Sequence, residues 1–221
     1  MLQAIERHTE YLDWVTIVFL ICFLLLVIVR QRFPKKFYNF ASILTSNKFM
    51  LFRGKESNPF HGFNILLFIV NALSVSVLIY WILDFYNLIK ADNYILNYVR
   101  IVTAYACFIL IKFGVEKIIS NIFDIDDAID YYLFQKLAYR NYIALLILPI
   151  TLLTVYSIKI TESLVYIIFT VIIIANLTSF FNIFKKQQKL IINNWFYFIL
   201  YLCALEIAPY FILYKLITVK Y

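Results

Sequence analysis

The sequence predicts an all-α membrane protein, a bundle of about six transmembrane helices, on two observations. Of its 221 residues, 64% are hydrophobic and 15% are charged, whereas soluble domains average roughly 45–50% and about 25%. Several apolar runs approach the roughly 20 residues that a helix needs to cross a bilayer. Continuous runs of this length are helices, because lipid leaves an open strand no partner for its backbone groups.

The apolar runs divide the chain, taken as one polytopic domain over residues 1–221, into six predicted spans. These spans are residues 12–30, 63–83, 95–119, 142–157, 164–184 and 191–214. The first is expected to be retained, because no basic segment of a cleavable signal peptide precedes it. Aromatic residues near the span ends are predicted to form belts at the membrane surfaces. They are Trp14, Tyr80, Trp81, Trp195 and Tyr214.

The lysines and arginines predict the orientation of the bundle. With the N-terminus outside, 14 of the 20 basic residues fall on the inner side, as the positive-inside rule requires. These are Arg30, Arg32, Lys35, Lys36, Lys48, Arg53, Lys55, Lys112, Lys117, Lys136, Arg140, Lys185, Lys186 and Lys189. Six spans return the chain to the starting side, so both termini are predicted to face the periplasm of a bacterium.

Two inner segments are long enough to hold structure of their own. In the first, Phe37, Phe40 and Leu44 recur at helical spacing among basic and polar residues. This pattern predicts an interfacial amphipathic helix over residues 35–52, lying on the inner leaflet. The second segment, residues 124–141, opens with four acids that favour a helix N-terminus over a calcium loop. The acids are Asp124, Asp126, Asp127 and Asp130.

An acid and a helix breaker interrupt the last predicted span. Glu206 lies in "LYLCALEIAPYFILYK", and Pro209 follows within one turn. A carboxylate inside a span costs about 2.5–3.5 kcal/mol and normally faces the bundle interior, and proline frees a carbonyl nearby. Two interpretations stay open, a pair that fixes helix packing or a polar site for a cation, a proton or a substrate. We expect an interior Glu206 whose partner is Arg100, Asn176 or a group of another subunit.

The third predicted span carries a further pair of charges. Lys112 and Glu116 are four residues apart in "ILIKFGVEKII" and therefore share a helix face. A neutralised pair near the inner surface and a conduction or substrate path are the two interpretations. Gly114 is predicted to let another helix approach closely at this level.

Motifs of catalysis and cofactor binding do not occur in the sequence. There is no GxSxG, HExxH, Walker or dinucleotide-binding motif. The two histidines, His8 and His61, fall on opposite sides of the predicted membrane and cannot share a metal ion or a haem. No catalytic residue, cofactor or metal is therefore expected. The basic residues are explained by topology, so membrane lipids and other membrane subunits or a second copy are the expected partners, and nucleic acid is not.

Four stretches resemble one family of small polytopic membrane proteins of the Bacteroidota, a domain of unknown function. They are "ERHTEYLDWVTIVFL", "KFGVEKIISNIFDID", "YRNYIALLILP" and "FYFILYLCALEIAPYFILYK". The resemblance covers nearly the whole chain and implies a bacterial inner-membrane location without an assigned activity. It singles out Asp13, Trp14, Lys112, Glu116, Lys117, Asp126, Pro149, Glu206, Pro209 and Lys215.

Three classes of function compete. The first is a non-catalytic membrane subunit or scaffold of an envelope complex, for example in protein export or envelope assembly, and it is the class we favour. The second is an ion-coupled transporter of small solutes that uses Glu206 with Lys112 and Glu116. The third is a membrane enzyme on a lipid-linked substrate, which would use the acidic cluster with Lys136 and Arg140.

Overall fold

The computed structural model describes residues 13–43, 61–89, 93–122, 126–157 and 161–193. All regular elements within these ranges are helices, which confirms the predicted all-α class. They are α1 (Asp13–Arg32), α2 (Pro34–Ala41), α3 (Gly62–Phe85), α4 (Tyr94–Ile122), α5 (Asp126–Tyr156) and α6 (Glu162–Asn193). Every one except α2 is long and apolar enough to cross a membrane. The sixth predicted span, residues 191–214, lies almost entirely outside the described residues.

Two helices form the centre of the bundle, and the others surround them. In the membrane-crossing stretches of α3 and α5, 50% and 56% of the residues are buried inside the bundle. In those of α4 and α6, 11% of the residues are buried. α3 contacts α1, α4 and α5, and α5 contacts α3, α4 and α6. The outer helices expose large apolar side chains over most of their surface, as helices bathed in lipid do.

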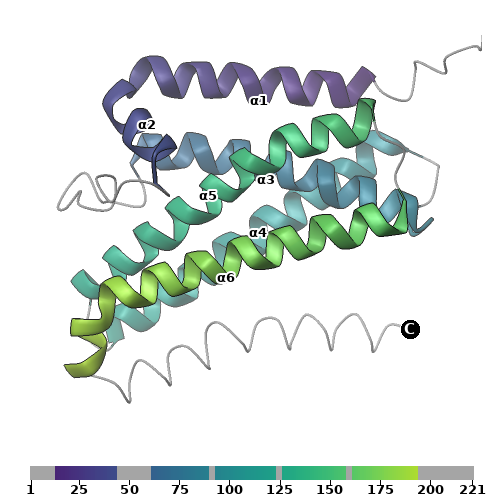
Figure 1. Ribbon diagram of the computed structural model, residues 1–221. Helices are drawn as coiled ribbons and strands as arrows, with labels where there is room; N and C mark the ends of the chain where they lie inside the picture. Colours follow the sequence, from purple (N-terminus) through teal and green to yellow (C-terminus); the bar gives the residue numbers. More distant parts are fainter. Residues whose placement is uncertain (1–12, 44–60, 90–92, 123–125, 158–160, 194–221) are drawn as a thin grey trace, which may run out of the picture.

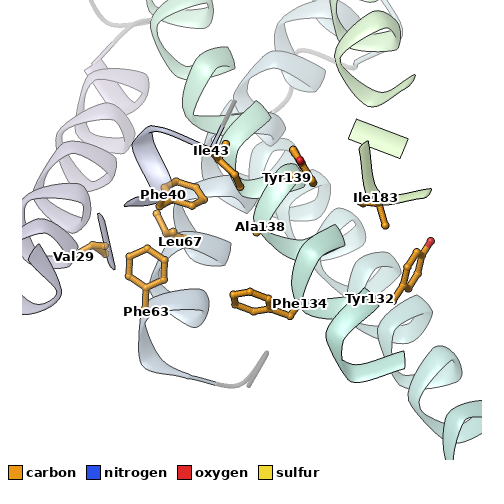
Figure 2. Packing of buried hydrophobic residues seen from close by; sticks show 10 residues of the cluster. All are labelled: Val29, Phe40, Ile43, Phe63, Leu67, Tyr132, Phe134, Ala138, Tyr139 and Ile183. Carbon is orange, nitrogen blue, oxygen red and sulfur yellow. The ribbon is translucent and has the colours of Figure 1, made fainter. Parts of the chain in front are cut away.

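Successive long helices run in alternate directions (Figure 1). The short helix α2 lies where α1 ends and α3 begins, and α4 and α6 finish at this same end of the bundle. We call it the α2 end, and the other the opposite end. A packed cluster joins five helices at the α2 end (Figure 2). It comprises Val29, Phe40, Ile43, Phe63, Leu67, Tyr132, Phe134, Ala138, Tyr139 and Ile183.

The predicted fourth span is only the second half of a longer helix. α5 runs without interruption from Asp126 to Tyr156, with Pro149 inside it, and its membrane-spanning window begins at Asp130. The sequence-based boundary at residue 142 excluded Lys136 and Arg140 as charges of an inner loop. In the structure both lie within the helix. Contacts inside the bundle, with Glu116 for Lys136 and with the Phe68 ring for Arg140, compensate the cost of removing these charges from water.

The predicted interfacial helix differs from the structure in its position. The described helix, α2, ends at Ala41, and the remaining predicted residues beyond Ile43 lie outside the described part of the chain. Phe40, expected in lipid, is 1% exposed, and its ring lies 5.7 Å from that of Phe63 and 5.9 Å from that of Tyr142. The aromatic face of α2 is therefore covered by protein, because packing against α3 and α5 removes it from water as fully as lipid would.

The opposite end of the bundle is packed around aromatic rings. Trp14 lies edge-on to Tyr80 with ring centroids 5.1 Å apart, and its ring is 4.9 Å from that of Tyr98. Tyr80 is fully buried, so its assignment to a surface belt was wrong. The hydroxyl of Tyr98 donates a hydrogen bond to the carbonyl of Leu73 at 3.2 Å, which fastens α4 to α3.

Candidate functional site

A buried ion pair joins α4 to α5 near the α2 end. The Nζ of Lys136 lies 2.5 Å from Oε1 of Glu116. The Glu116 side chain is 2% exposed and that of Lys136 is 21% exposed. The Lys136 ammonium also lies 5.5 Å from the centre of the Tyr132 ring, within the range of a cation–π contact. A carboxylate so buried is tolerated because a cation and a hydrogen bond compensate its desolvation.

A second ion pair joins the same two helices closer to their ends. Lys117 and Asp130 are 2.7 Å apart, and their side chains are 37% and 43% exposed. Solvent weakens such a pair to about 0–1 kcal/mol. The Glu116–Lys136 pair is shielded from solvent by protein, whereas the Lys117–Asp130 pair is exposed. The first pair therefore contributes more to stability than the second.

One amide ties three helices together deeper in the bundle. The Asn71 side chain on α3 donates from Nδ2 to the carbonyl of Arg140 on α5 at 3.1 Å. Its Oδ1 accepts a hydrogen bond from the hydroxyl of Tyr105 on α4 at 2.9 Å. Tyr105, Lys112 and Glu116 follow one another on a single face of α4, at the seven- and four-residue spacing of a helix. Tyr105 and Glu116 therefore face α3 and α5, respectively, and not lipid.

Two further amides on α5 are buried without a protein partner in the described part of the chain. Gln135 is 0% exposed and Asn141 is 2% exposed. Neither the nitrogen nor the oxygen of either amide has a hydrogen bond. Each amide can donate and accept, so each could hold water or a small polar group. Leaving such groups unbonded costs about 1–3 kcal/mol.

The structure separates the residues of the predicted intramembrane site. Lys112 and Glu116 are buried on α4, 8% and 2% exposed. Arg100 is exposed in the first turns of the same helix, about 24 Å from Glu116 along its axis. Asn176 is exposed on α6, where its Nδ2 donates to the carbonyl of Ile172. Glu206 and Pro209 lie outside the described residues, so their pairing stays a prediction.

The predictions for the acidic cluster and for Gly114 have different outcomes in the structure. α5 begins at Asp126, within the cluster that predicted a helix N-terminus. Asp130 contacts Lys117, whereas Asp124 and the side chains of Asp126 and Asp127 lie outside the described part. Gly114 was expected at a close helix contact, yet an added methyl group would meet no atom of the described residues within 4 Å.

Sequence reasoning missed the partner of Glu116 and the buried amides of α5. Lys136, Gln135 and Asn141 fall in the segment that was assigned to an inner loop. The available signal was the continuity of helix-forming residues from Asp126 into the fourth apolar run, without a glycine or proline before Pro149. Asn71 is a small polar residue inside the predicted span 63–83, and the sequence does not show which helices it joins.

Comparison with known proteins adds a family and no activity. A family model described as Domain of unknown function (DUF4271) matches residues 15–217, nearly the whole chain. No curated protein and no solved structure matches the chain.

Proposed function

Since the chain belongs to the DUF4271 family, whose description carries no activity, we propose a function from its architecture. In this proposal the chain is a non-catalytic integral membrane subunit or scaffold of a bacterial envelope complex, such as one for protein export or envelope assembly. Its place is the inner membrane, with the α2 end toward the cytoplasm and both termini in the periplasm.

The observation that supports this proposal is the use of intramembrane polar side chains as braces. Asn71 bonds to two neighbouring helices at once, and Glu116 bonds to Lys136 across the α4–α5 contact. Such contacts hold the relative positions of helices fixed, as a frame for other subunits requires. The wide apolar surfaces of α1, α4 and α6 suit contact with lipid and with the spans of a partner.

The orientation is supported by the basic residues at the α2 end. Arg30 and Arg32 close α1, and Lys35 and Lys36 open α2. Positive charge of this density marks the cytoplasmic side. A periplasm-active reporter fused after Tyr221 should be active, and one fused within residues 44–60 should be inactive. Activity only in a cytoplasmic reporter after Tyr221 would contradict the proposed orientation.

Mild-detergent purification tests the subunit proposal. The parent chain should retain a membrane partner in fixed stoichiometry, measured by native mass spectrometry and identified by peptide sequencing. Asn71→Leu should lower the recovery of this partner, because it removes the brace between three helices. Asn141→Leu is the matched control, since the same substitution on α5 removes no hydrogen bond. A parent that purifies as a single chain with lipid alone would refute the proposal.

The buried Glu116–Lys136 pair favours a second candidate, an ion-coupled transporter of small solutes. Charges inside a span often mark ion or proton paths, and Lys112 lies one turn from Glu116 on the same face. Glu206 beside Pro209 would complete this site. Glu206→Gln should then abolish solute uptake into vesicles while the protein still inserts, and Glu206→Leu should impair both. Unchanged insertion and function in Glu206→Leu would remove Glu206 from any such site.

A further inference from the structure

The corner between α1 and α2 gathers positive charge. Four basic residues lie within seven positions, Arg30, Arg32, Lys35 and Lys36, which we call the basic corner. Three of their side chains are exposed and that of Lys36 is half-buried. Residues 30–43 contain no acid. The charged side chains of residues 30–43 are therefore all basic, unlike the start of α5, where Asp130 lies against Lys117.

The basic corner is rigidly held. The N–H of Phe33 donates to the carbonyl of Val29 at 3.0 Å, and that of Phe37 donates to the carbonyl of Phe33 at 2.9 Å. The backbone thus stays hydrogen-bonded as it turns from α1 into α2. The Phe33 ring lies 5.3 Å from that of His61 and 5.9 Å from that of Phe63. The backbone that carries the four cations is therefore fixed against the start of α3.

Packing of α2 fixes which way the corner faces. Phe40 is buried beside Phe63 in the cluster at the α2 end (Figure 2). Tyr38, on the other side of α2, is 77% exposed. The Nζ of Lys36 lies 3.5 Å from Nε2 of His61 at the start of α3. The Phe40 side of α2 is thus packed against the bundle, whereas Lys35 and Tyr38 face outward.

The length of α1 places the corner at the level of lipid headgroups. α1 has 20 residues from Asp13 to Arg32, so it is about 30 Å long. This length equals the thickness of the hydrocarbon layer. With the apolar residues of α1 in the hydrocarbon, Arg30 and Arg32 reach the phosphate level, where a tyrosine such as Tyr38 also prefers to lie.

We propose that the basic corner is a binding site for the headgroup phosphate of an anionic phospholipid in the adjacent leaflet. Guanidinium groups bind phosphate oxygens through paired hydrogen bonds, and the lysines add charge. Clusters of basic residues beside a span attract anionic lipid with about 1 kcal/mol for each charge. The proposal goes beyond the subunit role and does not depend on it, since lipid binding is measured on the isolated chain.

Titration of lipid into the full-length protein in mild detergent tests this site. Phosphatidylglycerol is compared with phosphatidylcholine of the same acyl chains, and bound lipid is counted by native mass spectrometry. The parent should prefer phosphatidylglycerol, and this preference should fall as salt is raised. Substituting all four residues of the corner by Gln should weaken phosphatidylglycerol binding more than about 100-fold, at about fivefold for each charge.

The matched control is Arg100→Gln, which removes an exposed cation at the opposite end of the bundle and should leave phosphatidylglycerol binding within about twofold of the parent. Equal binding of both lipids by the parent would overturn the proposal, whether or not the fourfold variant folds. Parent-like phosphatidylglycerol binding by the fourfold variant would also overturn it, and would leave the corner as a contact for protein acids. Displacement of the lipid by inorganic phosphate at low millimolar concentration would show that the site recognises phosphate alone and would refute the lipid assignment.

Discussion

Both ends of the bundle pack around aromatic rings, but the α2 end carries a buried ion pair in addition. At the α2 end, Glu116 and Lys136 meet as charges inside the protein. At the opposite end, Trp14 packs against Tyr80 and Tyr98 through ring contacts of 5.1 Å and 4.9 Å. One contact is a directed pair in which each partner needs the other. The second depends on close packing of the rings, so that removal of a ring leaves a cavity.

This difference matters in a membrane because lipid is as apolar as a protein core. Apolar side chains gain little by leaving lipid for the bundle, so the helices associate through close packing and internal polar contacts. Both ends supply close packing around aromatic rings, and the α2 end adds a buried pair of charges. Variants that break a polar pair should be rescued by removing its partner, whereas variants that remove ring volume should not.

The largest effect is expected from the ion pair. Glu116→Leu should lower the free energy of unfolding by about 3 kcal/mol, because the half-buried Lys136 ammonium loses the carboxylate that compensates its desolvation. The double variant Glu116→Leu with Lys136→Leu should recover most of this loss. Unfolding in a denaturing detergent titration measures both. The exposed pair Lys117–Asp130 is the control, and its removal should cost at most about 1 kcal/mol.

Loss of an aromatic ring at the opposite end should come next. Tyr80→Ala should cost about 3 kcal/mol, because the ring is fully buried and its removal leaves a cavity beside Trp14. The same titration measures it. Tyr86→Ala is the control, since Tyr86 is 44% exposed and should change stability by no more than about 0.5 kcal/mol. Equal losses in the two variants would show that the rings at this end do not form a packed core.

A smaller effect should separate the two buried asparagines. Asn71→Leu should cost about 1–2 kcal/mol, because it removes hydrogen bonds to Tyr105 and to the carbonyl of Arg140. Asn141→Leu should be neutral within about 0.5 kcal/mol or stabilising, because its amide has no hydrogen bond to any described residue. A cost for Asn141→Leu equal to that of Asn71→Leu would show that Asn141 holds water or a ligand.

The smallest effect is expected on the outer surface of the bundle. Gly114→Ala should raise the free energy of unfolding by about 0.5–1 kcal/mol, because glycine is a poor residue for a helix interior and the added methyl meets no atom of the described part of the chain within 4 Å. Thermal unfolding in detergent measures the change. A destabilised variant would show that another helix lies against Gly114 in the assembled protein.

The fold class and the approximate places of the spans could be predicted from the sequence, because length and hydropathy depend on neighbours along the chain. The place of Asp126 at the start of a helix could be predicted for the same reason. The charges of Lys136 and Arg140 made the predicted span begin too late in α5, because charged residues indicate a loop unless a buried partner is known. That partner, Glu116, lies 20 residues away on another helix.

The sequence by itself determined that the chain is a bundle of membrane helices with a basic end, and which polar residues the spans contain. Only the tertiary structure decided that Glu116 bonds to Lys136, that Asn71 joins three helices, and that Phe40 and Tyr80 are covered by protein. The physical reason is that a soluble helix shows its buried face by its apolar stripe. A membrane helix is apolar on every side, so the rotation that brings two side chains together is set by packing between helices.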